Sequence, residues 1–163
     1  AHALAAIRLM LTMLPETYRN GEDLHARQII LEGSLLAGLT ISNAKTTAVH
    51  AVSYPMTVFF HIPHGLACSL MLPSFIRFNA GSMRREKEQR LLASLNLDSM
   101  NQLAEAVEAL QEQLGLPVRL RDLGLGITDI ATIVDNGFRP DRMNNNPRDV
   151  TPAVLRRLLE EIL

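Results

Sequence analysis

The stretch TTAVHAVSYPMTVFFHIPHGLA, residues 46–67, consists of two apolar segments interrupted by Pro55 and Pro63. The first segment, from Thr46 to about Phe60, predicts an apolar helix that is strained or ended near Pro55, because proline lacks the amide donor of a helix interior. A second helix is expected to begin at Pro63-His64-Gly65, since proline is well tolerated in the first helical turn. The stretch therefore predicts two helices with a chain reversal between them.

Apolar residues recur at helical spacing on both sides of this stretch. An opening helix is expected to stop at Pro15. A second helix, from Glu22 to about Asn43, contains Gly33 and Gly38, which are interpreted as sites of close packing against another helix. Later helices are predicted at residues 82–95, 99–114 (capped by Ser99), 128–137 (capped by Thr128) and 151–162 (capped by Thr151), with a connector at 120–126 and a polar loop at 139–148.

These segments amount to about eight helices with no convincing strand, no repeat and no dividing linker. The predicted fold class is therefore all-α, as a single multi-helix, bundle-like domain over residues 1–163.

The composition is that of a folded globular protein, since 47% of the 163 residues are hydrophobic and 20% are charged. A formal net charge of −1 argues against nucleic-acid binding and against a polybasic membrane surface. We expect no signal peptide, because the first residues have neither a basic region nor a small-residue cleavage site after an apolar core. We also expect no transmembrane helix, because the most apolar region, residues 56–76, is interrupted by histidine, proline and glycine. The single cysteine, Cys68, argues against a disulfide and a Cys-based zinc site, and it indicates a reduced, cytoplasmic setting.

Three of the five histidines fall close together, at positions 50, 61 and 64. On one continuous helix, His50 and His64 would lie roughly 21 Å apart, too far to share a metal ion. If the chain reverses between them, as the prolines allow, the two imidazoles face each other from adjacent helices. No Asp or Glu lies between Glu32 and Glu86, so any further metal ligands must come from elsewhere.

The remaining candidates for chemistry are expected to be structural. His25 is predicted to be exposed, His61 to have a structural or surface role, and Cys68 to be a small buried apolar residue. Ser53 and Ser69 lie in no nucleophile motif, and no nearby acid completes a catalytic triad.

Several motifs in this sequence resemble the iron-containing (group III) alcohol dehydrogenases, and they occur in the same order as in that family. The resemblance covers nearly the whole chain and aligns it with the C-terminal helical domain of the family, a dehydroquinate synthase-like C-terminal domain. The matching motifs are AGLTISN at 37–43, Val49-His50, Tyr54-Pro55, IPHGLA at 62–67, Leu72-Pro73, Phe78-Asn79 and Asn146-Pro147-Arg148.

The resemblance implies a divalent metal, iron ahead of zinc, held by one Asp and three His. His50 and His64 match the last two of these ligands, whereas the Asp-x-x-x-His motif that supplies the first two is missing from this chain. Tyr54 stands where many members have a further His, which implies a catalytic position, and Ile41 is expected to line the substrate space. The cofactor implied for the full-length protein is NAD or NADP, bound by an N-terminal nucleotide-binding domain that is also missing here.

The implied function is that of the C-terminal domain of a metal-dependent, NAD(P)-linked alcohol dehydrogenase. It interconverts an alcohol and an aldehyde or ketone by hydride transfer, and the isolated chain is expected to be inactive. Expected partners are a small-molecule substrate, the missing N-terminal domain and another copy of the protein, with no nucleic acid and no membrane. The alternatives are a non-catalytic helical structural or interaction domain and another metalloenzyme of the same superfamily, such as a glycerol-dehydrogenase-like relative.

Overall fold

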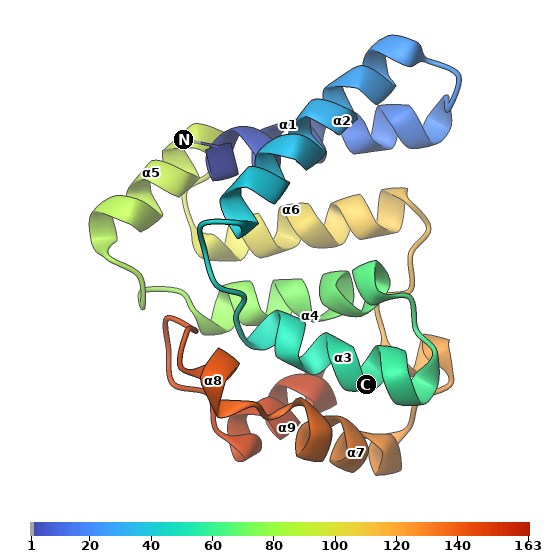
Figure 1. Cartoon of the computed structure of the whole chain (residues 1–163), viewed down its shortest axis with the longest axis vertical. Coiled ribbons are helices and arrows are strands. Elements are labelled where there is room, and N and C mark those ends of the chain that lie inside the picture. Colours follow the sequence, from blue (N-terminus) through green and yellow to red (C-terminus); the bar gives the residue numbers. More distant parts are fainter. Residues whose placement is uncertain (1) are drawn as a thin grey trace.

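A computed structural model describes residues 2–163, which form nine α-helices and one 3₁₀ helix, with no strand in that range (Figure 1). Ala1, with which the predicted domain begins, lies outside the described residues. The all-α prediction is confirmed. The elements are α1 (His2–Arg19), α2 (Leu24–Ile41), α3 (Ala48–Phe60), α4 (His64–Phe78), α5 (Arg85–Leu95), α6 (Met100–Gln113), η1 (Leu120–Leu123), α7 (Ile127–Gly137), α8 (Pro140–Met143) and α9 (Pro152–Glu161).

The helices are stacked in layers (Figure 1). α1 and α2 pack on each other as a hairpin at one end, and α1 also contacts α5 and α6. α4 lies between α6 and α3, and α7 lies between α3 and α9 at the other end. No helix within residues 2–163 combines the length and the apolar character needed to cross a bilayer.

The main hydrophobic core lies where α3, α4, α7 and α9 meet. A smaller cluster around Leu92, Met100 and Leu103 joins α5 to α6. Helix α3 is therefore held on both sides, by α4 and by α7, which fixes the direction in which its remaining side chains point. The largest fully buried side chains of the main core include Phe75, Met56, Met71, Ile133 and Leu155.

The prolines that are predicted to end or strain two helices lie inside those helices instead. α1 continues through Pro15 to Arg19, and α3 runs unbroken through Pro55. The chain reverses only after α3, at His61, which adopts a left-handed conformation with φ 56°. A helix-interior proline loses one backbone hydrogen bond, and packing offsets that loss at Pro55, which is buried between α3 and α7.

The two glycines of α2 have different roles. An added Cβ at Gly33 would lie 3.1 Å from Met10 Cε and 3.3 Å from Leu9 Cβ of α1, which confirms the predicted close helix packing. The same prediction is wrong for Gly38, because a Cβ there would meet nothing within 4 Å.

The predicted helix caps are confirmed in two places and wrong in one. The side chains of Ser99 and Thr151 each accept a hydrogen bond from the first turn of α6 and α9. Thr128 does not cap α7, because that helix already begins at Ile127 after Gly126. The predicted connector and polar loop contain the short helices η1 and α8.

Two of the sequence motifs contact each other across the fold. The Asn79 and Asn146 side chains exchange hydrogen bonds of 2.8 and 3.1 Å, and Asn146 also donates to the carbonyl of Arg148 at 2.7 Å. The Arg148 guanidinium donates to Ser82 Oγ and to the carbonyl of Ala80. The Asn-Pro-Arg segment therefore ties the end of α4 to the loop that precedes α9.

Candidate metal centre

Helices α3 and α4 bring His50 and His64 together. The centroids of their rings are 5.7 Å apart, and the ring planes meet at 60°. His50 lies in the first turn of α3, and His64 is the first residue of α4. The two rings meet because the chain reverses at residues 61–63, so that α4 runs back along α3. The predicted juxtaposition of the two imidazoles is confirmed.

Cys68 is a third member of this cluster. Its Sγ lies 3.7 Å from His64 Nε2, and one potential ligand atom from each of His50, His64 and Cys68 lies within 4.8 Å of the others. The prediction that Cys68 is a buried apolar residue is therefore wrong, since the side chain is half-buried beside two imidazoles. The missed signal is the spacing of four between His64 and Cys68, which puts both on one face of α4.

Ser53 orients the imidazole of His64. The Ser53 hydroxyl donates to the carbonyl of His50 at 2.9 Å, and its oxygen lies 3.2 Å from His64 Nδ1. Because the hydroxyl proton is already used, Ser53 Oγ accepts from Nδ1–H, and His64 Nε2 keeps its lone pair for a metal ion. Ser53 is fully buried, whereas the His64 side chain is exposed, so one side of this contact is fixed by the core and the other faces solvent.

The environment favours the neutral forms of His50 and Cys68. Burial lowers the pKa of His50, and the proximity of His64 and the positive charge of Arg142 lower it further. A neutral imidazole is the form that binds a metal ion. Burial raises the pKa of the Cys68 thiol, against the opposing effect of its hydrogen bond to Ser53. Cys68 is therefore a thiol rather than a thiolate, and the two imidazoles are the readier ligands.

Tyr54 lies between the histidine cluster and an arginine. Its ring stacks on His64 with centroids 5.6 Å apart, and Arg142 Cζ of α8 lies 4.6 Å from the Tyr54 ring centroid. A cavity of about 340 Å³ adjoins this side of the site. It is lined by Ala51, Tyr54, Asn136, Arg139, Asp141 and Arg142.

The other residues predicted for the site lie apart from it. Ile41 ends α2, is 54% exposed and does not line this cavity, so its role in the substrate space stays a prediction. His25 is exposed near the start of α2, and His61 is the exposed residue at which α3 ends. Within residues 2–163, no carboxylate joins the three potential ligands.

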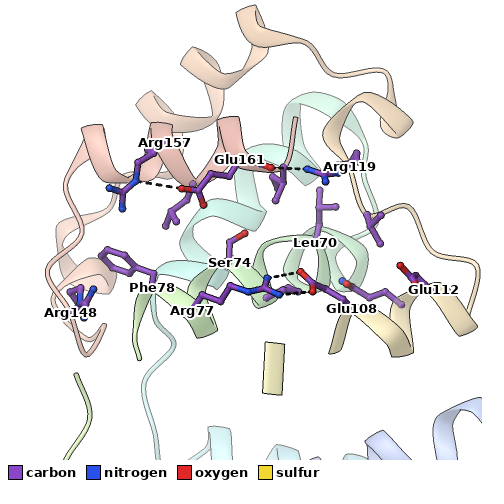
Figure 2. A pocket seen from close by; sticks show the side chains of 15 residues that line it. Leu70, Ser74, Arg77, Phe78, Glu108, Glu112, Arg119, Arg148, Arg157 and Glu161 are labelled. Carbon is purple, nitrogen blue, oxygen red and sulfur yellow. Dashed lines mark hydrogen bonds and ion pairs between the residues drawn. The ribbon is translucent and has the colours of Figure 1, made fainter. Parts of the chain in front are cut away.

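A larger cavity of about 650 Å³ lies between α4, α6 and α9 (Figure 2). Figure 2 shows the Arg77 guanidinium making two parallel bonds of 2.6 Å to the carboxylate of Glu108 at its edge. None of His50, Tyr54, His64 and Cys68 lines it. The chemistry of the imidazoles is therefore confined to the α3–α4 side of the molecule.

The residues present match part of a metal site. Imidazole and thiol donors suit zinc and iron, and a catalytic site of this kind has three or more protein ligands and one open position. His50 and His64 supply two imidazole donors from adjacent helices, and Ser53 contacts one of them. The arrangement therefore fits a divalent metal ion whose coordination is completed by further ligands.

Comparison with known proteins identifies relatives over the full chain. The family model for the Fe-containing alcohol dehydrogenase family, C-terminal, matches residues 1–163. The 1-propanol dehydrogenase PduQ of Salmonella typhimurium is 31% identical over 176 residues, which cover 100% of this chain and 48% of that protein. The 1,3-propanediol dehydrogenase of Klebsiella pneumoniae is 28% identical, and the match covers 91% of this chain and 40% of that protein.

Solved structures of relatives have the same fold. The sulfoacetaldehyde reductase from Bifidobacterium kashiwanohense, in complex with NAD+, superposes with a TM-score of 0.90 at 30% identity, covering 99% of this chain and 42% of that one. A 1,3-propanediol oxidoreductase superposes with a TM-score of 0.89 at 28% identity, covering 100% of this chain and 44% of that one. The chain thus spans less than half the length of these relatives. It belongs to the iron-containing alcohol dehydrogenase family and corresponds to the C-terminal helical domain of that family.

Proposed function

We propose that residues 1–163 are the C-terminal helical domain of a larger, metal-dependent alcohol dehydrogenase. The full-length enzyme would interconvert an alcohol with an aldehyde or ketone by hydride transfer to or from NAD or NADP. Family membership supports this proposal, as do relatives that are named for propanol, propanediol and sulfoacetaldehyde. The location proposed is the cytoplasm, where a free thiol such as Cys68 stays reduced.

His50 and His64 are proposed as two ligands of a divalent metal ion, iron ahead of zinc. When bound, such an ion supplies Lewis-acid chemistry to an alcohol or carbonyl oxygen. His50 is kept neutral by burial, and Ser53 holds the His64 ring with Nε2 free. The remaining ligands and the nucleotide site belong to the rest of the enzyme.

Tyr54 is proposed as a catalytic residue that contacts the substrate, because its ring lies against His64 and borders the small cavity. Ile41 is proposed to line the substrate space near the end of α2. The Tyr54 proposal has the stronger structural support, since the structure brings its ring to the imidazole cluster.

The α2 surface supports an interface in the full-length protein. Leu24, Leu31 and Leu35 are 79%, 70% and 63% exposed, whereas apolar side chains of this size are usually at least half-buried. We propose that the missing nucleotide-binding domain or a second copy of the protein covers this face of the hairpin.

The proposed function depends above all on the meeting of His50 and His64. The test uses the full-length enzyme with His50→Ala, His64→Ala and the control His25→Ala, whose side chain is exposed on α2. We expect each variant of the pair to lose most of its bound metal, measured by mass spectrometry, and about 100-fold or more of its NAD(P)-linked alcohol oxidation. The His25 variant should match the wild type. Full metal content and activity without either histidine would favour a non-catalytic helical domain.

The isolated chain gives a second test, because it lacks the Asp-x-x-x-His motif. Calorimetric titration with Zn²⁺ should show only weak binding and no dehydrogenase turnover. A tight one-to-one site would instead show that residues 1–163 complete their own ligand set. Cys68→Ser would then identify the third ligand, because a serine hydroxyl is a poor zinc ligand.

A further inference from the structure

The small cavity beside Tyr54 has an unusual lining. Three of its six lining residues are charged, Arg139, Asp141 and Arg142, and all three belong to the start of α8. The cavity measures about 340 Å³, which is at the lower end of the range for small-molecule sites. Its charged side chains sum to one net positive charge, so the cavity favours an anion over a cation.

Both arginines of this cavity lack a carboxylate partner. The ion pairs within residues 2–163 involve Arg19, Arg77 and Arg157, and neither Arg139 nor Arg142 has a carboxylate oxygen within 4.0 Å. The side-chain hydrogen bond of Arg142 is a long one, 3.5 Å, to Thr46 Oγ1. A guanidinium has five N–H donors, so most of those on Arg142 are available to a ligand.

Tyr54 holds the Arg142 guanidinium beside the histidine cluster. The guanidinium carbon lies 4.6 Å from the centroid of the Tyr54 ring, a cation–π contact, and the same ring stacks on His64 at 5.6 Å. Arg142 and His64 therefore contact the same tyrosine ring, although neither histidine lines the cavity itself. A molecule of a few carbon atoms would have to extend past Tyr54 to place one end at the two imidazoles and the other at Arg142.

We infer that the substrate carries an anionic group, such as a carboxylate or sulfonate, a few bonds from its alcohol or aldehyde carbon, and that Arg142 with Arg139 binds that group. The inference rests on the proposed function, because it specifies the substrate class of the same site. Arg142 then determines specificity: its planar donors bind an anionic oxygen pair, while the substrate's reactive end lies at the histidine cluster.

The first experiment measures binding without turnover. The full-length protein is titrated by calorimetry with ethanesulfonate and with the neutral ethyl methyl sulfone, in wild type, Arg142→Met, Arg142→Lys and Arg90→Met. Arg90 is an exposed arginine on α5, a helix that packs against α1, so it is the matched control. We expect Arg142→Met to weaken ethanesulfonate binding about tenfold or more and Arg142→Lys to weaken it less, with the sulfone unaffected.

The second experiment measures turnover of 4-oxobutanoate and its neutral methyl ester. We expect Arg142→Met to lower kcat/KM about 100-fold for the anion and less than about threefold for the ester. Thermal unfolding of each variant checks the fold, and the Arg142→Lys variant keeps the charge if Arg142→Met unfolds. Equal losses for both aldehydes, or unchanged ethanesulfonate binding, would overturn the inference and indicate that Arg142 only supports Tyr54.

Two further outcomes separate the explanations. If Arg142→Met weakens NADH or NADPH binding about tenfold in a fluorescence titration, the anion is a cofactor phosphate and the inference is overturned. If ethanesulfonate binding depends on Arg142 but neither aldehyde is reduced, the anion site is upheld and the proposed dehydrogenase function fails. Turnover of both aldehydes with no preference for the anion would uphold the function and overturn the inference.

Discussion

Gly137→Ala tests how closely α7 packs on α3. Gly137 is the last residue of α7 and is buried. An added Cβ would lie 3.2 Å from Pro55 Cγ, 3.2 Å from Val52 Cα and 3.5 Å from the carbonyl oxygen of Ala51. These atoms belong to the α3 backbone or to a proline ring, so none can rotate away. The helices must instead separate by a few tenths of an ångström.

The cost of this substitution follows from overpacking. Extra atoms in a well-packed core destabilise proteins by about 1–3 kcal/mol, and replacing glycine by alanine at a helical position returns at most about 1 kcal/mol. We therefore expect Gly137→Ala to lower the free energy of unfolding by about 1–2 kcal/mol. Since Tyr54 precedes Pro55, the shift should also move the tyrosine relative to His64.

Urea denaturation followed by circular dichroism measures this change in stability. The slope of the unfolding free energy against urea concentration is expected to stay constant. Gly38→Ala is the matched control, because its Cβ would meet nothing within 4 Å on the exposed side of α2. That variant should gain about 0.5–1 kcal/mol. A Gly137→Ala protein as stable as the wild type would refute the argument, since it would mean that α3 and α7 do not approach as closely as the structure shows.

Three other substitutions test contacts elsewhere in the fold. Arg77 lowers the pKa of Glu108 below its ordinary value of 4.5, so their pair stabilises the protein above that pH and the contribution is lost as the pH falls through the lowered pKa. Both side chains are more than a third exposed, so Glu108→Gln should cost less than about 1 kcal/mol at pH 7 and nothing measurable near pH 2 in urea denaturation. Asn146→Ala should cost about 1–3 kcal/mol in the same assay, because it leaves Asn79 without its side-chain partner. Thr151→Ala should cost about 1 kcal/mol by removing the cap of α9, measured as a lower Tm.

Each of these predictions has an outcome that contradicts it. If Glu108→Gln lowers the free energy of unfolding equally at both pH values, the substitution acts through packing rather than through the charge of the carboxylate. An Asn146→Ala protein of wild-type stability would show that water replaces the amide pair. A Thr151→Ser variant as unstable as Thr151→Ala would argue against the hydroxyl as the stabilising group, because serine keeps the cap.

Local sequence patterns are enough to predict most helices and some of their ends. Ser99 and Thr151 cap helices as expected because a cap bonds to a backbone amide only three residues away. Prolines are the exceptions at this level. Pro15 and Pro55 both lie inside helices, and at Pro55 the close approach of Gly137, a distant residue, supplies packing that offsets the lost backbone bond.

The sequence by itself determined the all-α fold class and the family resemblance, which follow from periodicity and from motifs in order. It also allowed His50 to meet His64, because the prolines between them permit a reversal of the chain, and the structure shows that meeting. Only the tertiary structure decided that Ser53 and Cys68 join the histidines and that Arg142 reaches Tyr54. Arg142 and its partner Thr46 are 96 positions apart, and no local pattern links them. Their contact depends on how α8 packs against α3, which is set by the burial of side chains from several helices at once.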